Sequence, residues 1–252
     1  MTGEDENTVH SVERALDIVE GLKTLETAGV TELADHTGMP PSTVYNYLQT
    51  LEGREYVRKD GERYELANRF IHIGDFAKHR LPLYRIGKPN LNWLAETTGK
   101  TANLVVEEYG RGIYLLSETN ERTLQNYSHV RRREYLHSTA VGKAILMSMT
   151  EAEIDEVIEE HGLPALTGET ITDRDALLAD VETAREQGYA INDEENTTGI
   201  RAVGAPIRNP QGSYAAVSVS GHASRYSLEE VHDELADATL DAAKAINVEL
   251  ES

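Results

Sequence analysis

The sequence predicts an α+β protein, in which helices flank an antiparallel sheet. Runs of alternating apolar and polar residues, typical of half-buried strands, appear from about residue 101 onwards. Helical apolar spacing fills most of the preceding segment and returns in the last 26 residues, from Ser227. The chain has 252 residues, enough for two ordinary domains.

The N-terminal segment begins with an amphipathic helix that is predicted to end at Gly29. Its apolar residues recur at three- and four-residue steps: Val9, Val12, Leu16, Val19, Leu22 and Leu25. Thr31 is a natural N-cap for a short second helix. A third helix is predicted after Pro40 and Pro41, because proline suits a helix start and not its interior. It would bury three residues: Val44, Leu48 and Leu51.

The next stretch, "REYVRKDGERYEL", predicts a two-stranded hairpin around the tight turn "KDGE". Three helices followed by a hairpin form a winged helix-turn-helix. We therefore expect this fold over residues 1–72, then a helical linker over 73–80 and a second domain over 81–252. The helical pattern around the linker is expected to be interrupted at Pro82 and Pro89.

The second domain shows a series of strand and helix patterns. Strands are predicted at "TANLVVEEY", "RGIYLLSET", "LQNYSHV", "GIRAVGAPIR" and "SYAAVSVSG", with "NP" and "QG" supplying the turn of the last pair. Helices are predicted at "STAVGKAILMSM" and near 151–160 and 173–187. A closing helix from Ser227 would bury Leu228, Val231, Leu235, Ala238, Ala242 and Ile246.

Composition excludes several classes of protein and points to an unusual environment. The chain has no cysteine, which rules out disulfides and thiolate metal sites, and its nine histidines form no ligand pair, so we expect no metal and no cofactor. No apolar run is long enough to span a bilayer, and the N-terminus is acidic, so a cytoplasmic protein is expected. The formal net charge of −20 is spread along the chain, which suggests a cytoplasm of very high salt.

Several blocks, in order along nearly the whole chain, resemble the IclR family of transcriptional regulators. They are "SVERALDIVEGL", "TELADHTGMPPSTVYNYLQTLE", "YLHSTAVGKAIL", "GLPALTGETITDRDAL", "REQGYAINDEENTTGIRAVGAPIRNPQG" and "AAVSVSGHASR". The resemblance implies an N-terminal winged helix-turn-helix that binds double-stranded operator DNA and a C-terminal GAF-like domain that binds a small-molecule effector. It also implies a homodimer or homotetramer formed largely through the DNA-binding region.

The expected DNA-binding segment is itself acidic. Residues 1–76 contain seven Lys and Arg against fifteen Asp and Glu, a net charge of −8. The third helix offers neutral polar side chains on the side away from Val44 and Leu48: Ser42, Thr43, Tyr45, Asn46 and Gln49. Asn and Gln can pair with adenine, and Ser and Thr can reach bases or phosphates. The basic residues cluster where phosphates would pass: Arg54, Arg58, Lys59 and Arg63.

The family often places a basic residue where Pro41 and Asn46 stand. The chain has replaced charge with neutral contacts, which suits strong salt because counterion release then yields little.

Effector-binding candidates come from three segments of the second domain. Ser138, Thr139 and Ala140 stand at a predicted helix N-terminus, where free backbone N–H groups favour an anion. Ser218 and Ser220 lie two apart on a strand and point to one face. The residues that the resemblance places in the effector pocket are Ala140, Val141, Asn192, Ala202, Ser218 and Ser220, and Asp193 follows in an acidic loop ahead of the next strand.

A small organic acid, either sugar-derived or aromatic, is the expected effector. Tyrosines could supply an aromatic wall: Tyr114, Tyr127 and Tyr135. The chain departs from the family at Asn192, where Asp is frequent, near Ala202, where Cys is common, and at Val141, which is bulkier than usual.

Two other function classes stay open at this point. An enzyme is disfavoured, because the chain has no cysteine nucleophile, no GxSxG sequence and no recognisable triad. The second class is a sensor or interaction protein whose winged helix docks on protein, a possibility that the negative first segment favours. Sequence-selective retention on DNA at high KCl separates the second class from a transcriptional regulator.

Overall fold

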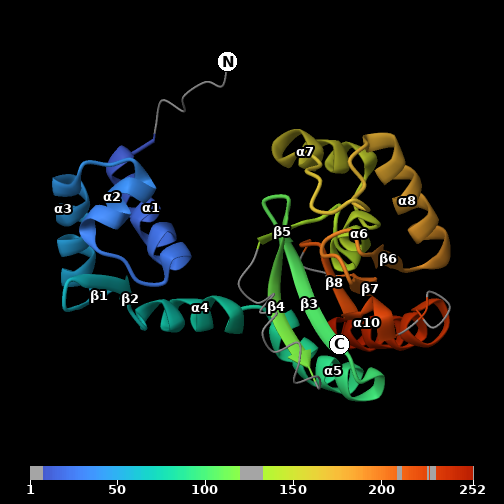
Figure 1. Cartoon of the computed structure of the whole chain (residues 1–252). Coiled ribbons are helices and arrows are strands. Elements are labelled where there is room, and N and C mark those ends of the chain that lie inside the picture. Colours follow the sequence, from blue (N-terminus) through green and yellow to red (C-terminus); the bar gives the residue numbers. More distant parts are fainter. Residues whose placement is uncertain (1–7, 120–132, 209–211, 226, 228–230, 252) are drawn as a thin grey trace. The chain divides into compact units, whose positions relative to one another are not determined.

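A computed structural model describes residues 8–119, 133–208, 212–225, 227 and 231–251 (Figure 1). Internal contacts divide the chain into two compact units, Met1–Arg80 and Leu81–Ser252. No helix among the described residues combines the length and the apolar character needed to cross a membrane.

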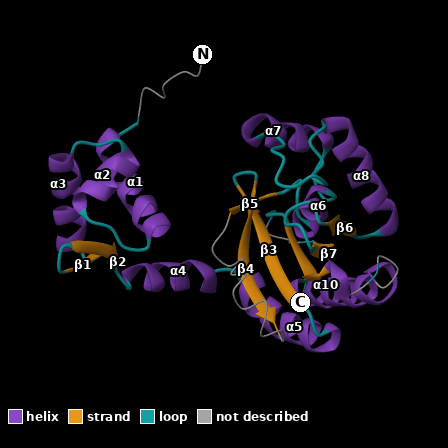
Figure 2. Cartoon of the chain, viewed as in Figure 1, coloured by secondary structure: helices purple, strands orange, loops and turns teal. Residues whose placement is uncertain are grey.

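The first unit packs three helices on a hairpin. They are α1 (His10–Leu25), α2 (Val30–Thr37), α3 (Pro41–Gly53), β1 (Val57–Asp60) and β2 (Arg63–Leu66), and the strands pair antiparallel (Figure 2). Their core gathers one buried cluster: Ile18, Leu22, Ala28, Leu33, Ala34, Val44, Leu48, Val57 and Tyr64. This arrangement confirms the predicted winged helix-turn-helix.

The prediction that the apolar face of the first helix is buried was only partly right. Leu22 is fully buried, but Val9, Val12 and Leu16 are 59%, 55% and 58% exposed within this chain. The core instead receives Ile18 and Gly21, and the exposed residues lie at the N-cap and on the first two turns of α1. The C-terminal part of the apolar stripe therefore packs into the core, whereas its N-terminal part stays exposed on the surface of this chain.

Two predicted helix ends also differ. Helix α1 ends at Leu25, because Glu26 takes a left-handed φ of 61° that no helix continues. Helix α2 begins at Val30 with Gly29 as its N-cap, so Thr31 is not the cap. Glu32 reaches back to the Gly29 backbone N–H at 3.4 Å and takes the role expected of a capping side chain.

Two further helices follow the hairpin. Helix α4 (Arg69–His79) contains most of the predicted linker, and α5 (Pro82–Thr98) starts at the first of the two prolines. The expected interruption at Pro89 was wrong, because α5 runs through it. Proline removes one backbone donor, and Asn90 donates a side-chain hydrogen bond of 3.0 Å to the Ile86 carbonyl in the same turn.

Six strands among the described residues of the second unit form one antiparallel sheet. They are β3 (Thr101–Glu108), β4 (Arg111–Thr119), β5 (Arg133–Tyr135), β6 (Ala190–Asp193), β7 (Ile200–Ile207) and β8 (Ala215–His222), in the spatial order β5-β4-β3-β8-β7-β6. The sheet confirms the predicted α+β class. Strands β5 and β6 were not predicted, and the strand expected at "LQNYSHV" and the "NP" turn lie outside the described residues.

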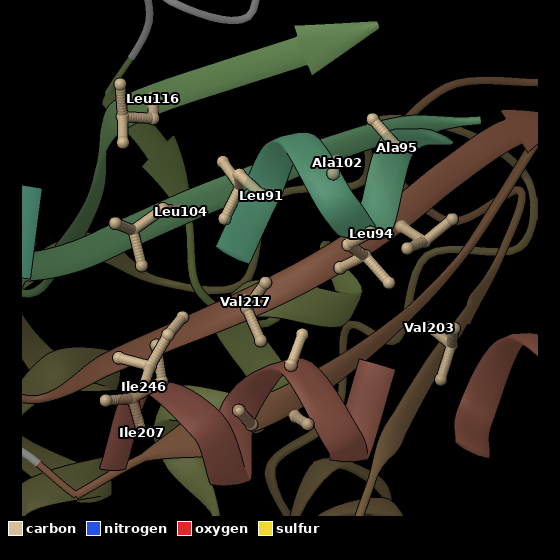
Figure 3. Packing of buried hydrophobic residues seen from close by; sticks show 14 of the residues in the cluster. Leu91, Leu94, Ala95, Ala102, Leu104, Leu116, Val203, Ile207, Val217 and Ile246 are labelled. Carbon is tan, nitrogen blue, oxygen red and sulfur yellow. The ribbon is translucent and has the colours of Figure 1, made fainter. Parts of the chain in front are cut away.

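Helices cover both faces of this sheet. Helices α5 and α10 (Ala236–Leu250) pack on one face, where Leu91, Leu104, Val217 and Ile246 meet (Figure 3). Helices α6 (Ala140–Leu146), α7 (Glu151–His161) and α8 (Arg174–Gln187) belong to the core on the other face. A π-helical turn, Val231–Leu235, precedes α10, and Leu228 lies outside the described residues.

Candidate functional site

Helix α3 presents a polar face to solvent. Val44 and Leu48 fix its orientation because both are fully buried. The opposite side carries the predicted residues, with Thr43 half-buried and Ser42, Tyr45, Asn46 and Gln49 exposed. Gln49 makes one weak contact, a 3.3 Å hydrogen bond from its amide to Glu52. The face is therefore uncharged and available along its length.

The basic residues of the hairpin divide into two kinds. Arg58 lies opposite Glu65 across the hairpin and donates to its carboxylate through Nε at 2.8 Å. Arg63 donates to the Thr27 carbonyl at 2.5 Å and to the Glu32 carboxylate at 2.9 Å, which ties the hairpin to α2. Both arginines are neutralised within the protein.

Arg54 and Lys59 have no carboxylate partner among the described residues. Arg54 follows α3 directly and is exposed. Lys59 lies 5.4 Å from the centre of the Tyr64 ring, and its pKa is raised by the nearby Tyr64 hydroxyl and by Glu62. Of the four predicted phosphate contacts, these two keep an unshared positive charge.

A pocket lies between the start of α6 and the adjoining end of the sheet. The empty space within it, counted together with the open solvent at its mouth, is about 370 Å³. Seven predicted residues line it: Thr139, Ala140, Val141, Asn192, Ala202, Ser218 and Ser220. Strand register explains the grouping, because Asn192 pairs with Ala202 and Ala202 pairs with Ser220 across three neighbouring strands.

The predicted alternation on β8 is confirmed. Ser218 and Ser220 line the pocket, while Val217 and Val219 belong to the core under α5 and α10. Gly204 pairs with Ser218 and permits close approach of α6, because a Cβ there would lie 2.6 Å from the Ala140 carbonyl oxygen. The floor of the pocket is thus made by residues that the sheet, not a loop, holds in place.

Two predicted residues do not line the pocket. Ser138 donates to the Tyr135 carbonyl at 3.4 Å and accepts from the Asn196 amide at 3.2 Å, beside the pocket wall. Asp193 lies on the other face of strand β6, where Arg201 donates to it at 2.7 Å. The loop expected at Asn192 and Asp193 is a strand, and alternation along it sends the two side chains in opposite directions.

Three lining residues were missed: Asn103, Asn196 and Ile200. Asn103 lies on β3, where it accepts a 2.8 Å hydrogen bond from Ser117 and donates to Ser220 at 3.4 Å. A buried Asn between two hydroxyl-bearing strands is the signal that could have found it, because "TANLV" places this amide inside an apolar run.

Tyr114 is the predicted tyrosine that lines the pocket. Burial raises the pKa of its hydroxyl, and the carboxylate of Glu134 raises it further, so the hydroxyl stays neutral. Tyr135 instead stacks under the Arg111 guanidinium at 3.6 Å, and Tyr127 lies outside the described residues. Among the described residues, no group of three His, Asp or Glu is arranged to hold a metal ion.

The surface of α3 and the pocket lie in two segments that separate family models match. The model described as "IclR helix-turn-helix domain" matches residues 11–61, and the one described as "Bacterial transcriptional regulator IclR C-terminal" matches residues 76–248.

Relatives align over almost the whole chain. The probable HTH-type transcriptional regulator ArcR of Halobacterium salinarum is 36% identical, covering 97% of this chain and 95% of its own. The regulator BhcR of Paracoccus denitrificans is 31% identical, over 98% and 89%.

Solved structures agree with the sequence matches. The IclR structure of Thermotoga maritima, 30% identical, superposes with a TM-score of 0.78 over 96% of this chain and 99% of its own. A homologue from Microbacterium hydrocarbonoxydans, crystallised with 4-hydroxybenzoate, shares the fold at a TM-score of 0.82 with 18% identity, over 95% and 98%. With both of its units matched in order, the chain belongs to the IclR family of transcriptional regulators, which bind DNA and are not enzymes.

Proposed function

We propose that this regulator reads its operator through the neutral face of α3 and responds to a small organic acid held in the pocket under α6. The observation that carries the first half is the exposed, uncharged side of α3, with Asn46 and Gln49 one turn apart. Both side chains can pair bidentately with adenine in the major groove. Arg54 and Lys59 supply the phosphate contacts beside it.

Few cations are left to contact phosphates in this unit, and this limits the electrostatic part of the affinity. Arg58 and Arg63 are already paired with carboxylates, so binding DNA would have to displace those carboxylates before either arginine gained a phosphate. A reader that depends mainly on neutral hydrogen bonds loses little affinity as salt increases. The net charge of −20 and the Halobacterium relative support a halophilic host, where such a reader would work.

The pocket supports a polar effector of modest size. Its walls combine amides and hydroxyls from Asn103, Asn192 and Ser218 with the apolar side chains of Val141 and Ile200. Amides and hydroxyls can make more hydrogen bonds than those they form within the protein, and the carboxylate and hydroxyl groups of a small acid are suited to such additional bonds. The complex of the Microbacterium homologue with 4-hydroxybenzoate supports an acid of this general kind.

The exposed apolar residues of the first unit support a homodimer. Val12 and Leu16 of α1 and Ile71 and Phe76 of α4 are 55%, 58%, 60% and 68% exposed. Large apolar side chains gathered on two helices are typical of an interface between subunits. We propose that a second copy covers them, so that two α3 helices address the two halves of one operator.

The test of DNA reading is fluorescence anisotropy with DNA from the region upstream of the protein's own gene, at KCl from roughly 0.2 M to a few molar. Selective binding that persists at multimolar KCl is the expected result. Scrambled DNA of equal length is the control. Loss of selective binding across the whole range would refute DNA reading and favour docking of the winged helix on a protein.

Effector binding is tested by thermal unfolding in the presence of individual acids, including D-gluconate and 4-hydroxybenzoate. Ser218→Leu fills the pocket floor and serves as the control variant. A binder should raise the melting temperature of the natural protein and leave that of Ser218→Leu unchanged. An equal rise in both proteins would place the binding elsewhere.

A further inference from the structure

Lys143 is a buried cation in a strongly acidic chain. Its side chain is 1% exposed, and its Nζ lies 2.8 Å and 3.1 Å from the two carboxylate oxygens of Glu195. A carboxylate oxygen of Asp180, on α8, lies 2.9 Å away. The side chain of Glu195 is 9% exposed, whereas that of Asp180 is 37% exposed and remains partly hydrated. The buried partner of Lys143 is therefore Glu195.

The two charges belong to different walls of the pocket. Lys143 follows Val141 by two residues on α6, and Val141 lines the pocket. Glu195 lies between Asn192 and Asn196 in the connection from β6 to β7, and both asparagines line the pocket. The ion pair thus joins the two walls from behind, without itself lining the space.

Glu195 also fixes the orientation of a pocket amide. Its backbone N–H donates to Asn192 Oδ1 at 3.2 Å, and its carboxylate accepts from the Asp193 backbone N–H at 3.3 Å. Its carbonyl oxygen accepts from Thr170 at 2.6 Å. The Asn192 amide nitrogen donates to the Ser138 carbonyl, so both ends of this amide are held.

A buried ion pair is a poor means of stabilising a fold. Two charges lose their hydration on burial, and apolar replacement of both partners is often neutral or stabilising. The burial penalty is visible in Glu195, whose pKa is raised by desolvation and by Asp180, against the opposing effect of Lys143. A pair of this kind is better explained by what it holds in place.

We infer that Lys143 and Glu195 are positioning residues that hold the β6–β7 connection against α6 and so set the width of the pocket and the orientation of Asn192. The inference rests on the proposed role of the pocket, but its test needs neither effector nor DNA. With the pair intact, the pocket keeps one shape when empty. Without it, the connection separates from α6 and the floor becomes accessible.

The absence of cysteine allows a direct measurement in the whole 252-residue chain. Ser218→Cys places a single thiol on the pocket floor, at a position 3% exposed, and its rate of reaction with methyl methanethiosulfonate reports access. The pair is then replaced by Lys143→Met together with Glu195→Met. Thr183→Cys, exposed on α8, corrects for any change in reagent or general reactivity.

The floor thiol of the double variant should react about tenfold faster, while the melting temperature stays within a few degrees of the parent's. The connection can open locally without a change in global stability, and replacing both charges by apolar side chains leaves no unpaired buried charge. Lys143→Met alone should lower the melting temperature as well, since it leaves Glu195 buried and unpaired. Arg174→Met is the matched control, because it removes the ion pairs that Arg174 makes with Glu151 and Asp155 on α7. Arg174→Met should leave the reaction of the floor thiol as slow as in the parent.

An unchanged thiol rate in the double variant would overturn the inference, whatever its melting temperature. Should that variant fail to fold, Glu195→Gln provides the same test with the side-chain volume kept. It should accelerate the floor thiol, and an unaltered rate would again refute positioning. A second change at Asp180 that restored the slow reaction of the floor thiol in these variants would also refute the inference, because the inference assigns the role to Glu195.

Discussion

Replacing Gly204 by alanine should distort the pocket while leaving the domain folded. The glycine lies on β7 directly under the first turn of α6 and pairs with Ser218. An added Cβ would lie 2.6 Å from the Ala140 carbonyl oxygen and 2.9 Å from the Val141 nitrogen. These neighbours are backbone atoms, so no side-chain rotation can relieve the contact, and the helix itself must move.

The required shift can be worked out from this geometry. Ordinary contact begins at 3.4 Å, so the Ala140 oxygen must retreat by about 0.8 Å. Overpacking of this kind typically costs about 1–3 kcal/mol. In a domain of this size that corresponds to a fall of roughly 2–12 °C in melting temperature. Ala140 and Val141 line the pocket, so any effector that fits the natural protein should bind at least about tenfold more weakly.

The assay is thermal unfolding in concentrated KCl, followed by an effector titration at a temperature where every variant is folded. Gly168→Ala is the control in the same domain, because a Cβ there meets nothing within 4 Å. It should be neutral or slightly stabilising. A Gly204→Ala protein with the natural melting temperature and affinity would show that α6 does not rest on this strand as described.

Three further predictions concern other parts of the molecule. Asn46→Ala with Gln49→Ala should weaken operator binding by more than about 30-fold, as two bidentate contacts are worth roughly 1–3 kcal/mol each, and unchanged anisotropy would refute base reading. Burial lowers the pKa of His137 below 6.5, so the unfolded chain binds more protons than the folded one as pH falls through that value. His137→Gln should therefore remove up to about 1.4 kcal/mol per pH unit of destabilisation below pH 6.5, measured by denaturant unfolding of both proteins; parallel pH curves would contradict this. Leu16→Glu should weaken self-association by about 10- to 100-fold in sedimentation experiments, and an intact dimer would exclude α1 from the interface.

Local patterns predicted the elements well where one physical cause dominated. The alternation of Ser218 and Ser220 with valines is a property of the strand itself, so the face that they share could be read directly from the sequence. Pro40 and Pro41, at the N-cap and first position of α3, likewise mark its start without help from the rest of the fold. Both features depend only on near neighbours in the chain.

The features that the sequence did not predict depend on tertiary structure. Strand β6 has four residues, too few for alternation to emerge, and its pairing with β7 is what makes it a strand. Asn103 and Asn196 join the pocket through neighbours distant in sequence, which spacing along one segment cannot show. Val12 and Leu16 matched a buried helix face in the sequence, yet the fold of one chain leaves them exposed.

The alternation of side chains along β3 has a consequence for how a signal could leave the pocket. Asn103 faces the pocket, while its neighbour Leu104 faces the opposite layer and touches α5 at Gly87, where the helix has no side chain of its own. Only Arg80 and Leu81 separate helix α5 from α4, the helix that ends the first unit. A molecule bound in this pocket would therefore be separated from helix α5 by the thickness of one strand, so a displacement of a single peptide unit in β3 would alter the packing on both sides at once.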